Sequence, residues 1–191
     1  MSLTREPRTA RLPALGQSSL ALGLAILAWL APIRAANADG IKDANDTVAL
    51  FKKSDPSLTR FFSHAVGYAV FPSVGKGGLG IGGAYGSGIL YVRGNPLGKT
   101  TLTQVTVGFQ LGGQAYSEII FFESEKVLAD FKAGNFAFAA GVSAVALESG
   151  ASANAKYREG VAVFTATKAG LMFEAAIGGQ KFSYDALGHK K

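Results

Sequence analysis

The sequence predicts an α+β fold: a strongly coiled, mostly antiparallel, barrel-like sheet with N-terminal helices and one internal helix. Helical periodicity is confined to the segment after residue 39 and to one later stretch. Runs of β-branched and aromatic residues fill most of the remainder. These runs follow one another too closely for a helix to cross between parallel strands, so consecutive strands are expected to pair antiparallel.

The N-terminus has the three-part pattern of a secretory signal peptide. Three arginines precede an apolar stretch from Leu20 to Ile33, and Ala36–Ala38 offers the small residues that a signal peptidase reads. A membrane anchor is the alternative, but spanning a bilayer takes about 20 apolar residues and this stretch is shorter. We therefore expect residues 1–38 to be a cleaved signal and residues 39–191 to form one domain that is exported, either periplasmic or secreted.

Composition limits the partners of this domain. The whole chain carries 19 basic and 13 acidic residues. Removal of residues 1–38 takes away four basic residues and one acidic residue, so the remaining domain has a net charge of +3. So small a charge on an exported chain argues against nucleic acid as a partner. The sequence has no cysteine, so a hydrophobic core must hold the domain together without disulfides.

Three helices are expected. The apolar residues that share one face of the first are Ile41, Ala44, Val48 and Phe51. A second, short helix begins at Asp55-Pro56, an N-cap followed by proline at the first helical position, and ends at Gly67. The third interrupts the strands, with Ser124 as its N-cap and Gly134 at its end.

Nine strands are expected after the second helix. They are Tyr68–Phe71, Leu79–Tyr85, Gly88–Arg93, Thr100–Leu111, Ala115–Glu123, Phe136–Leu147, Val161–Thr167, Leu171–Ile177 and Gln180–Tyr184. The segment Pro72–Gly78 is expected to be a loop and Gly94–Gly98 a turn.

An aliphatic-Gly-Gly motif recurs at Ile81, Leu111 and Ile177. Glycine pairs weaken a strand unless the backbone must bend there or be approached closely. We interpret them as corners of a coiled, barrel-like sheet, and a glycine-lined ligand groove is the alternative.

Motifs for catalysis are incomplete. The stretch Gly78–Gly83 matches a dinucleotide-binding fingerprint, but no helix begins there and no acidic residue follows at the required distance. The stretch Gly94–Thr100 is one residue too short for a phosphate-binding P-loop. Glu118 and Glu123 lie five apart on one strand, so they point to opposite faces. With no clustered metal ligands either, the sequence predicts a non-enzymatic protein without cofactor or metal.

Charge is distributed unevenly along the chain. No acidic residue lies between Asp55 and Glu118, whereas four basic residues do. Glycine-rich strands carry few charges of either sign, which is one explanation; an electropositive face for phosphate-bearing lipid or another polyanion is the other. The candidate lipid-binding residues are Lys52, Lys53, Arg60, Lys76, Arg93 and Lys99.

Several strings resemble the SYLF domain family. They are Gly67–Pro72, Gly75–Gly78, Thr106–Gln114, Glu118–Phe122, Gly160–Phe164 and Gly178–Phe182, together with Tyr157. The resemblance extends from about Ala44 to Tyr184. It implies a non-enzymatic lipid-binding module, because eukaryotic members bind phosphoinositide membranes and some bind actin or its regulators.

The resemblance also implies where a membrane is contacted: the helix at Ile41–Lys53 and Lys76 match the positions used in the family. Asp43 and Asp46 make this helix a poor membrane inserter, however. The expected function is binding of anionic, phosphoinositide-like membranes. A protein partner in the cell envelope is the alternative, and a hydrolase of envelope polymers is a distant third.

Overall fold

The structure is a computed structural model, and it describes residues 38–188 apart from residue 80 and the segments 108–111, 139–143 and 170–177. The chain divides into two units, Met1–Asn37 and Ala38–Lys191. Apart from Ala38, the predicted signal peptide lies outside the described residues. Within the described part of the chain, no helix is long and apolar enough to cross a membrane.

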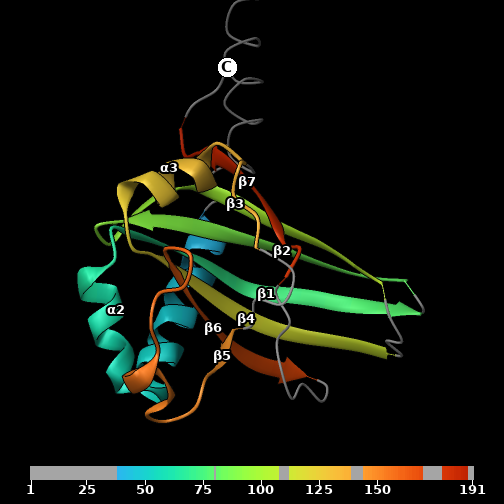
Figure 1. Cartoon of the computed structure of the whole chain (residues 1–191), viewed down its shortest axis with the longest axis horizontal. Coiled ribbons are helices and arrows are strands. Elements are labelled where there is room, and N and C mark those ends of the chain that lie inside the picture. The colour runs from blue at the N-terminus through green and yellow to red at the C-terminus, as the bar shows by residue number, and fades with distance from the viewer. Residues whose placement is uncertain (1–37, 80, 108–111, 139–143, 170–177, 189–191) are drawn as a thin grey trace, which may run out of the picture. The chain divides into compact units, whose positions relative to one another are not determined.

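A seven-stranded sheet forms the centre of the second unit, in the order β5-β6-β4-β1-β2-β3-β7 (Figure 1). Its strands are β1 (Gly67–Leu79), β2 (Ile81–Val92), β3 (Asn95–Val107), β4 (Gly112–Phe122), β5 (Val145–Ala146), β6 (Val161–Ala169) and β7 (Lys181–Ala186). Neighbouring strands pair antiparallel except β5 and β6, which pair parallel. The predicted mixed α+β class with a mostly antiparallel sheet is therefore confirmed.

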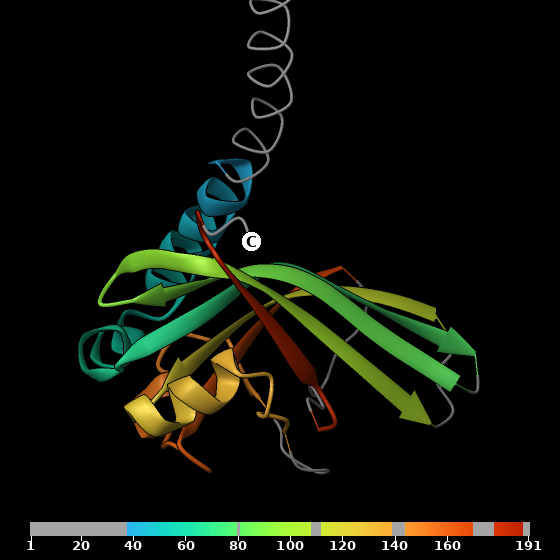
Figure 2. The same cartoon turned by 90° about the horizontal axis from the view of Figure 1, so that it is seen from above.

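The sheet does not close into the barrel-like form that the sequence predicted. Its two edges are β5 and β7, and the described strands contain no pairing between them. The sheet twists strongly, as Figure 2 shows, but helices lie on both of its faces. Because helices bury both apolar faces, the sheet can remain open.

One face is covered by three helical segments: residues 38–54, η1 (Pro56–Leu58) and α2 (Thr59–His64). The predicted apolar face of the first helix is confirmed, since Ala44 and Phe51 are buried and Ile41 and Val48 pack beside them. Phe121 of β4 belongs to the same cluster.

The opposite face is covered by α3 (Glu125–Lys132), which buries Leu128 and Phe131 against the sheet (Figure 2). This internal helix is the one that the sequence predicted. The Ser124 Oγ accepts a hydrogen bond from the Val127 amide at 3.4 Å, and Gly134 ends the helix with a φ of 73°.

The predicted loop at Pro72–Gly78 is wrong, because these residues lie within β1. The register shifts near Pro72 on both sides, and a bulge of this kind accommodates a residue without an amide hydrogen. The following glycines pair with β2 and with β4 simultaneously. Hydrogen bonds from two neighbouring strands therefore outweigh the low strand propensity of glycine.

Other strand bounds also differ from the prediction. The turn lies at Arg93–Gly94, and β3 already begins at Asn95, so the predicted turn is too long. Of the predicted strand Phe136–Leu147, only β5 forms, with an isolated bridge at Ala137, and residues 139–143 lie outside the described residues. The predicted strand Leu171–Ile177 also lies outside them.

Two of the three predicted glycine pairs, in β2 and β4, lie on either side of two further glycines of β1, and the third, Gly178-Gly179, lies in a turn before β7. Gly77 of β1 pairs with Gly83 of β2 and with Gly113 of β4. Gly78 likewise pairs with Gly82 and Gly112. Their positions are inside an open sheet, so they are not the corners of a closed barrel.

Candidate functional site

A hollow of about 420 Å³ opens where α2 meets the segment that precedes β6. We call it the α2 hollow, and its lining is Arg60, Phe61, His64, Glu123, Ala155, Lys156 and Tyr157. A second hollow of about 380 Å³ adjoins it, shares Ala155 and Lys156, and adds Arg158. Volumes of this size suit small ligands and headgroups.

Asp55 fixes the beginning of α2 against the far segment that forms the hollow. Its buried carboxylate accepts hydrogen bonds from the Ser57 amide at 3.0 Å, the Ser57 Oγ at 2.6 Å, the Gly150 amide at 3.2 Å and the Ser152 amide at 2.8 Å. Burial acts to raise the pKa of Asp55, but the hydrogen bonds outweigh it and hold the pKa well below its usual range. The carboxylate therefore joins η1 to η2 (Ala151–Asn154).

Arg60 is held in the wall of the α2 hollow by backbone carbonyls. Its Nη2 donates to the carbonyl oxygen of Ser152 at 2.6 Å and to that of Ala155 at 2.5 Å. The guanidinium carbon lies 4.7 Å from the centre of the Phe61 ring. Since a guanidinium has five N–H donors, several remain available for an anionic ligand.

His64 and Tyr157 add polar groups to the lining. The His64 Nδ1 lies 2.7 Å from the carbonyl oxygen of Arg60, which can only accept, so Nδ1 donates and Nε2 remains available. The Tyr157 hydroxyl is buried and has no hydrogen-bond partner among the described residues. Burial raises the pKa of Tyr157, and the negative charge of Glu123 raises it further. The positive charge of Arg60 lowers this pKa, so both charges act on the hydroxyl.

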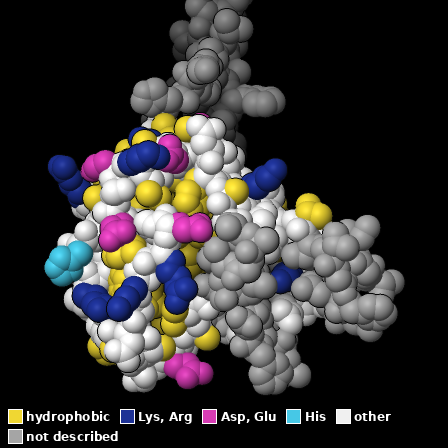
Figure 3. All heavy atoms as spheres, in the orientation of Figure 1, with side chains coloured by type: hydrophobic (Ala, Val, Ile, Leu, Met, Phe, Trp, Pro, Cys, Tyr) yellow, Lys and Arg dark blue, Asp and Glu magenta, His cyan; other side chains and the backbone are white. Residues whose placement is uncertain are grey.

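Figure 3 shows this face of the molecule. The histidine side chain lies at its left edge, with Lys and Arg side chains beside it and acidic side chains just above. The described residues contain no group of three or more His, Cys, Asp or Glu side chains that could hold a metal ion. The chemistry available in the α2 hollow is therefore ionic and hydrogen-bonding.

Comparison with known proteins shows which family the C-terminal half of the chain is similar to. Residues 103–187 match the model of the Ysc84 family, which is described as "Las17-binding protein actin regulator". Residues 103–187 are therefore similar to the Ysc84 family, also called SYLF. The resemblance inferred from the sequence strings is thereby confirmed, and the matched segment contains Glu123, Lys156 and Tyr157 of the α2 hollow.

A protein of Aeromonas veronii named Beta cell expansion factor A is similar to this chain. The two are 30% identical over 141 residues, which is 72% of this chain and 52% of the relative. The chain therefore spans about half the length of the curated relative that it matches.

Three of the six basic residues predicted to bind lipid lie on the helices that cover one face of the sheet. Arg60 lines the α2 hollow. Lys52 and Lys53 are exposed on the helix at 38–54, and the Lys52 Nζ lies 4.4 Å from the centre of the Phe62 ring of α2. Lys52 and Arg60 are thus both brought to α2.

The structure does not bring the other three candidates to α2. Lys76 of β1 pairs with Ala84 of β2, whereas exposed Arg93 follows Val92 at the other end of β2. At about 3.3 Å per residue, the strand from Ala84 to Val92 is about 26 Å long, so Lys76 and Arg93 lie far apart. Lys99 pairs with Ile89. Because Ala84 and Ile89 belong to the two different core clusters, Lys76 and Lys99 lie on opposite faces of the sheet.

Glu123, Lys156, Tyr157 and Arg158 were not among the binding residues predicted from the sequence, although Glu123 was placed on a strand and Tyr157 belonged to the family resemblance. One signal was available, since an aromatic residue between two cations at 156–158 is a pattern typical of anion-binding surfaces. Their proximity to Arg60 had no sequence signal, because about 95 positions separate the two segments.

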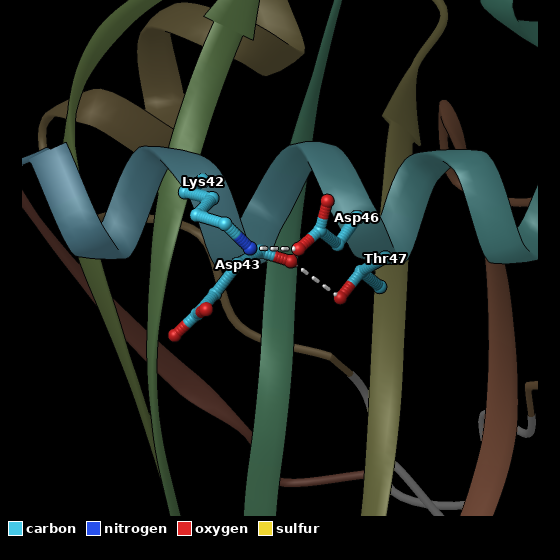
Figure 4. Close-up of polar contacts among 4 residues, drawn as sticks. All are labelled: Lys42, Asp43, Asp46 and Thr47. Atoms are coloured by element: carbon cyan, nitrogen blue, oxygen red, sulfur yellow. Dashed lines mark hydrogen bonds and ion pairs between the residues drawn. The ribbon is translucent and has the colours of Figure 1, made fainter.

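The helix at residues 38–54 uses its apolar face to pack on the sheet. Its exposed side carries an ion pair between the Lys42 Nζ and the Asp46 Oδ2 at 2.6 Å, and the Thr47 hydroxyl donates to the Asp43 carbonyl at 2.8 Å (Figure 4). An exposed side with charges of both signs and a buried apolar side do not favour insertion into a membrane.

Proposed function

We propose that this domain is an exported, non-enzymatic binding module for anionic phospholipid surfaces, and that the α2 hollow and its neighbour are its contact region. The observation that carries the proposal is the convergence of Arg60, Lys156 and Arg158 on two adjoining hollows. Each basic residue near an anionic membrane contributes about 1 kcal/mol of attraction. Lys52, beside α2, adds to the same surface.

A protein partner is the second candidate function. The description of the family model, a Las17-binding actin regulator, favours it. An exported protein meets cytosolic actin regulators only inside a host cell. For this reason, phosphate-bearing lipid is the preferred ligand, and a protein of the cell envelope is the alternative.

We expect Lys156→Glu combined with Arg158→Glu to weaken binding of the full-length protein to vesicles that contain phosphatidylglycerol. The loss should be at least about tenfold, because two attractions of about 1 kcal/mol each become repulsions. Sedimentation with vesicles at low salt measures it. The matched control is Lys168→Glu combined with Lys181→Glu, two exposed lysines on β6 and β7 outside the lining of both hollows, which gives the same change in net charge.

Absence of binding at low salt would contradict the proposal, since electrostatic adsorption is strongest there. An equal loss in the control with Lys168 and Lys181 reversed would show that only net charge matters. Charge reversal at Lys76, Arg93 or Lys99 tests the remaining sequence candidates. If reversal at one of these residues weakens vesicle binding more than reversal at Lys156 and Arg158, the membrane contact lies outside the hollows.

Export is part of the proposal and has its own test. Because the apolar stretch is followed by small residues at Ala36–Ala38, the protein from an expressing bacterium should begin at Asp39. Mass spectrometry of the intact protein from the periplasmic or medium fraction measures its N-terminus. A chain that retains residues 1–38 in the cytoplasm would contradict export.

A further inference from the structure

The α2 hollow carries charges of both signs. Arg60 and Lys156 line it together with the carboxylate of Glu123, which is exposed. The ion pairs among the described residues are Lys42–Asp46 and Lys126–Asp130, so neither Glu123 nor Lys156 is neutralised by a described neighbour.

A site for a simple anion gains nothing from a carboxylate in its wall, because the carboxylate repels the ligand. Unpaired charges of both signs around one hollow instead complement a ligand that carries both signs. The charges of Glu123 and Arg60 both act on the pKa of the Tyr157 hydroxyl, so the two charges lie close to the same wall of the hollow.

We propose that the α2 hollow binds a zwitterionic phosphate ester of ethanolamine, with its phosphate at Arg60 and Lys156 and its ammonium group at Glu123. The inference rests on the proposed function, because this group is the headgroup of an ethanolamine phospholipid. The same chemistry occurs in free phosphoethanolamine. A hollow of about 420 Å³ is large enough for either source.

The lining favours a primary ammonium group over a trimethylammonium group. A primary ammonium donates three hydrogen bonds, which a carboxylate such as Glu123 accepts, whereas quaternary ammonium is recognised by open aromatic faces. The Phe61 ring is already covered by the Arg60 guanidinium at 4.7 Å, and the Tyr157 ring packs edge-on against it at 5.4 Å. These aromatic rings therefore form a packed wall.

The test compares three soluble probes on the full-length protein by isothermal titration calorimetry. Phosphoethanolamine carries both charges, ethyl phosphate carries only the anion and phosphocholine carries a bulky quaternary group. We expect phosphoethanolamine to bind about fivefold or more tightly than either of the others, which is the effect of one additional exposed ion pair of about 1 kcal/mol.

Glu123→Gln should abolish this preference while ethyl phosphate binds as well as before or better, because a repelling carboxylate is gone. Glu148→Gln makes the same change in charge at an exposed residue outside the hollow and should leave the preference intact. Equal affinities for the three probes would overturn the inference. So would a preference that persists in Glu123→Gln or disappears in Glu148→Gln.

Vesicles distinguish the source of the ligand and separate this inference from the proposed function. If phosphoethanolamine binds as expected and adding ethanolamine phospholipid to anionic vesicles strengthens sedimentation, the headgroup is the ligand. If phosphoethanolamine binds but no vesicle does, the inference holds for a soluble ester and the proposed function fails. If the protein binds anionic vesicles but has equal affinity for the three probes, the inference fails and the proposed function stands.

Discussion

Replacing Asp55 with alanine should lower the free energy of unfolding by about 3 kcal/mol or more, because the substitution removes a buried acceptor of several hydrogen bonds. The amides of Gly150 and Ser152 lose this partner. Urea denaturation followed by circular dichroism measures the change. The hollow should also widen and bind ligand more weakly, because Ser152 no longer positions Arg60.

Asp43→Ala is the matched control, since Asp43 is exposed and its loss should change stability by no more than about 0.5 kcal/mol. The pH dependence provides a second check. The pKa of Asp55 is lower in the folded than in the unfolded protein. Its contribution to the free energy of unfolding is therefore complete above the unfolded-state pKa of about 3.9 and is lost as the pH falls from there towards the folded-state pKa. Similar stability losses for Asp55→Ala and Asp43→Ala would contradict this account.

Stability of the wild-type protein should fall as pH rises from 5 to 8, because of Glu118. This residue of β4 is fully buried, and burial raises its pKa to about 8, with the hydrogen bond from Gln180 acting in the opposite direction. The Gln180 Nε2 donates to the Glu118 Oε2 at 3.1 Å and to the Tyr116 hydroxyl at 3.3 Å. Folding therefore favours the neutral carboxyl group.

The sign follows from proton linkage. A group with a raised folded-state pKa contributes stability that is complete below its unfolded pKa and is lost as pH rises through the folded value. Between pH 4.5, the ordinary pKa of a glutamate, and about pH 8, the folded-state pKa of Glu118, the free energy of unfolding should fall by at most about 1.4 kcal/mol per pH unit. Glu118→Gln carries no ionisable group and should remove this slope.

Urea titrations at pH 5, 6, 7 and 8 measure this effect. Glu123→Gln, the same substitution at an exposed residue just beyond β4, should keep the wild-type slope. A wild-type stability that does not change over this range would contradict burial of a neutral Glu118. A Glu118→Gln variant with an unchanged slope would assign the dependence to another group.

The elements predicted correctly from the sequence are those with local causes. The spacing of Ala44 and Phe51 places both on one face of a helix, and that face is buried. Ser124 and Gly134 cap α3 through contacts within a few residues. Arg60 is the one of the six predicted lipid-binding residues that lines the α2 hollow, and its binding of lipid stays a prediction.

The elements predicted incorrectly depend on distant residues. Pro72 and the glycines after it have low strand propensity, and they are strand only because β2 and β4 pair with them on both sides. Glu118 and Glu123 are both acidic residues at β4, yet one is buried in the sheet and the other lines a hollow at the surface. The alternation along a strand predicted opposite faces for them, but it did not indicate which of the two would be buried.

The sequence by itself determined the mixed α+β class, the family resemblance and the positions of the capped helices, because these depend on residue types and spacings that act over a few residues. The tertiary structure decided that the sheet stays open and that Arg60 meets Lys156 and Tyr157. The physical reason is that Asp55 accepts hydrogen bonds from residues 150 and 152 and Arg60 donates to residues 152 and 155, which joins segments about 95 positions apart. Such contacts are set by packing of the whole domain.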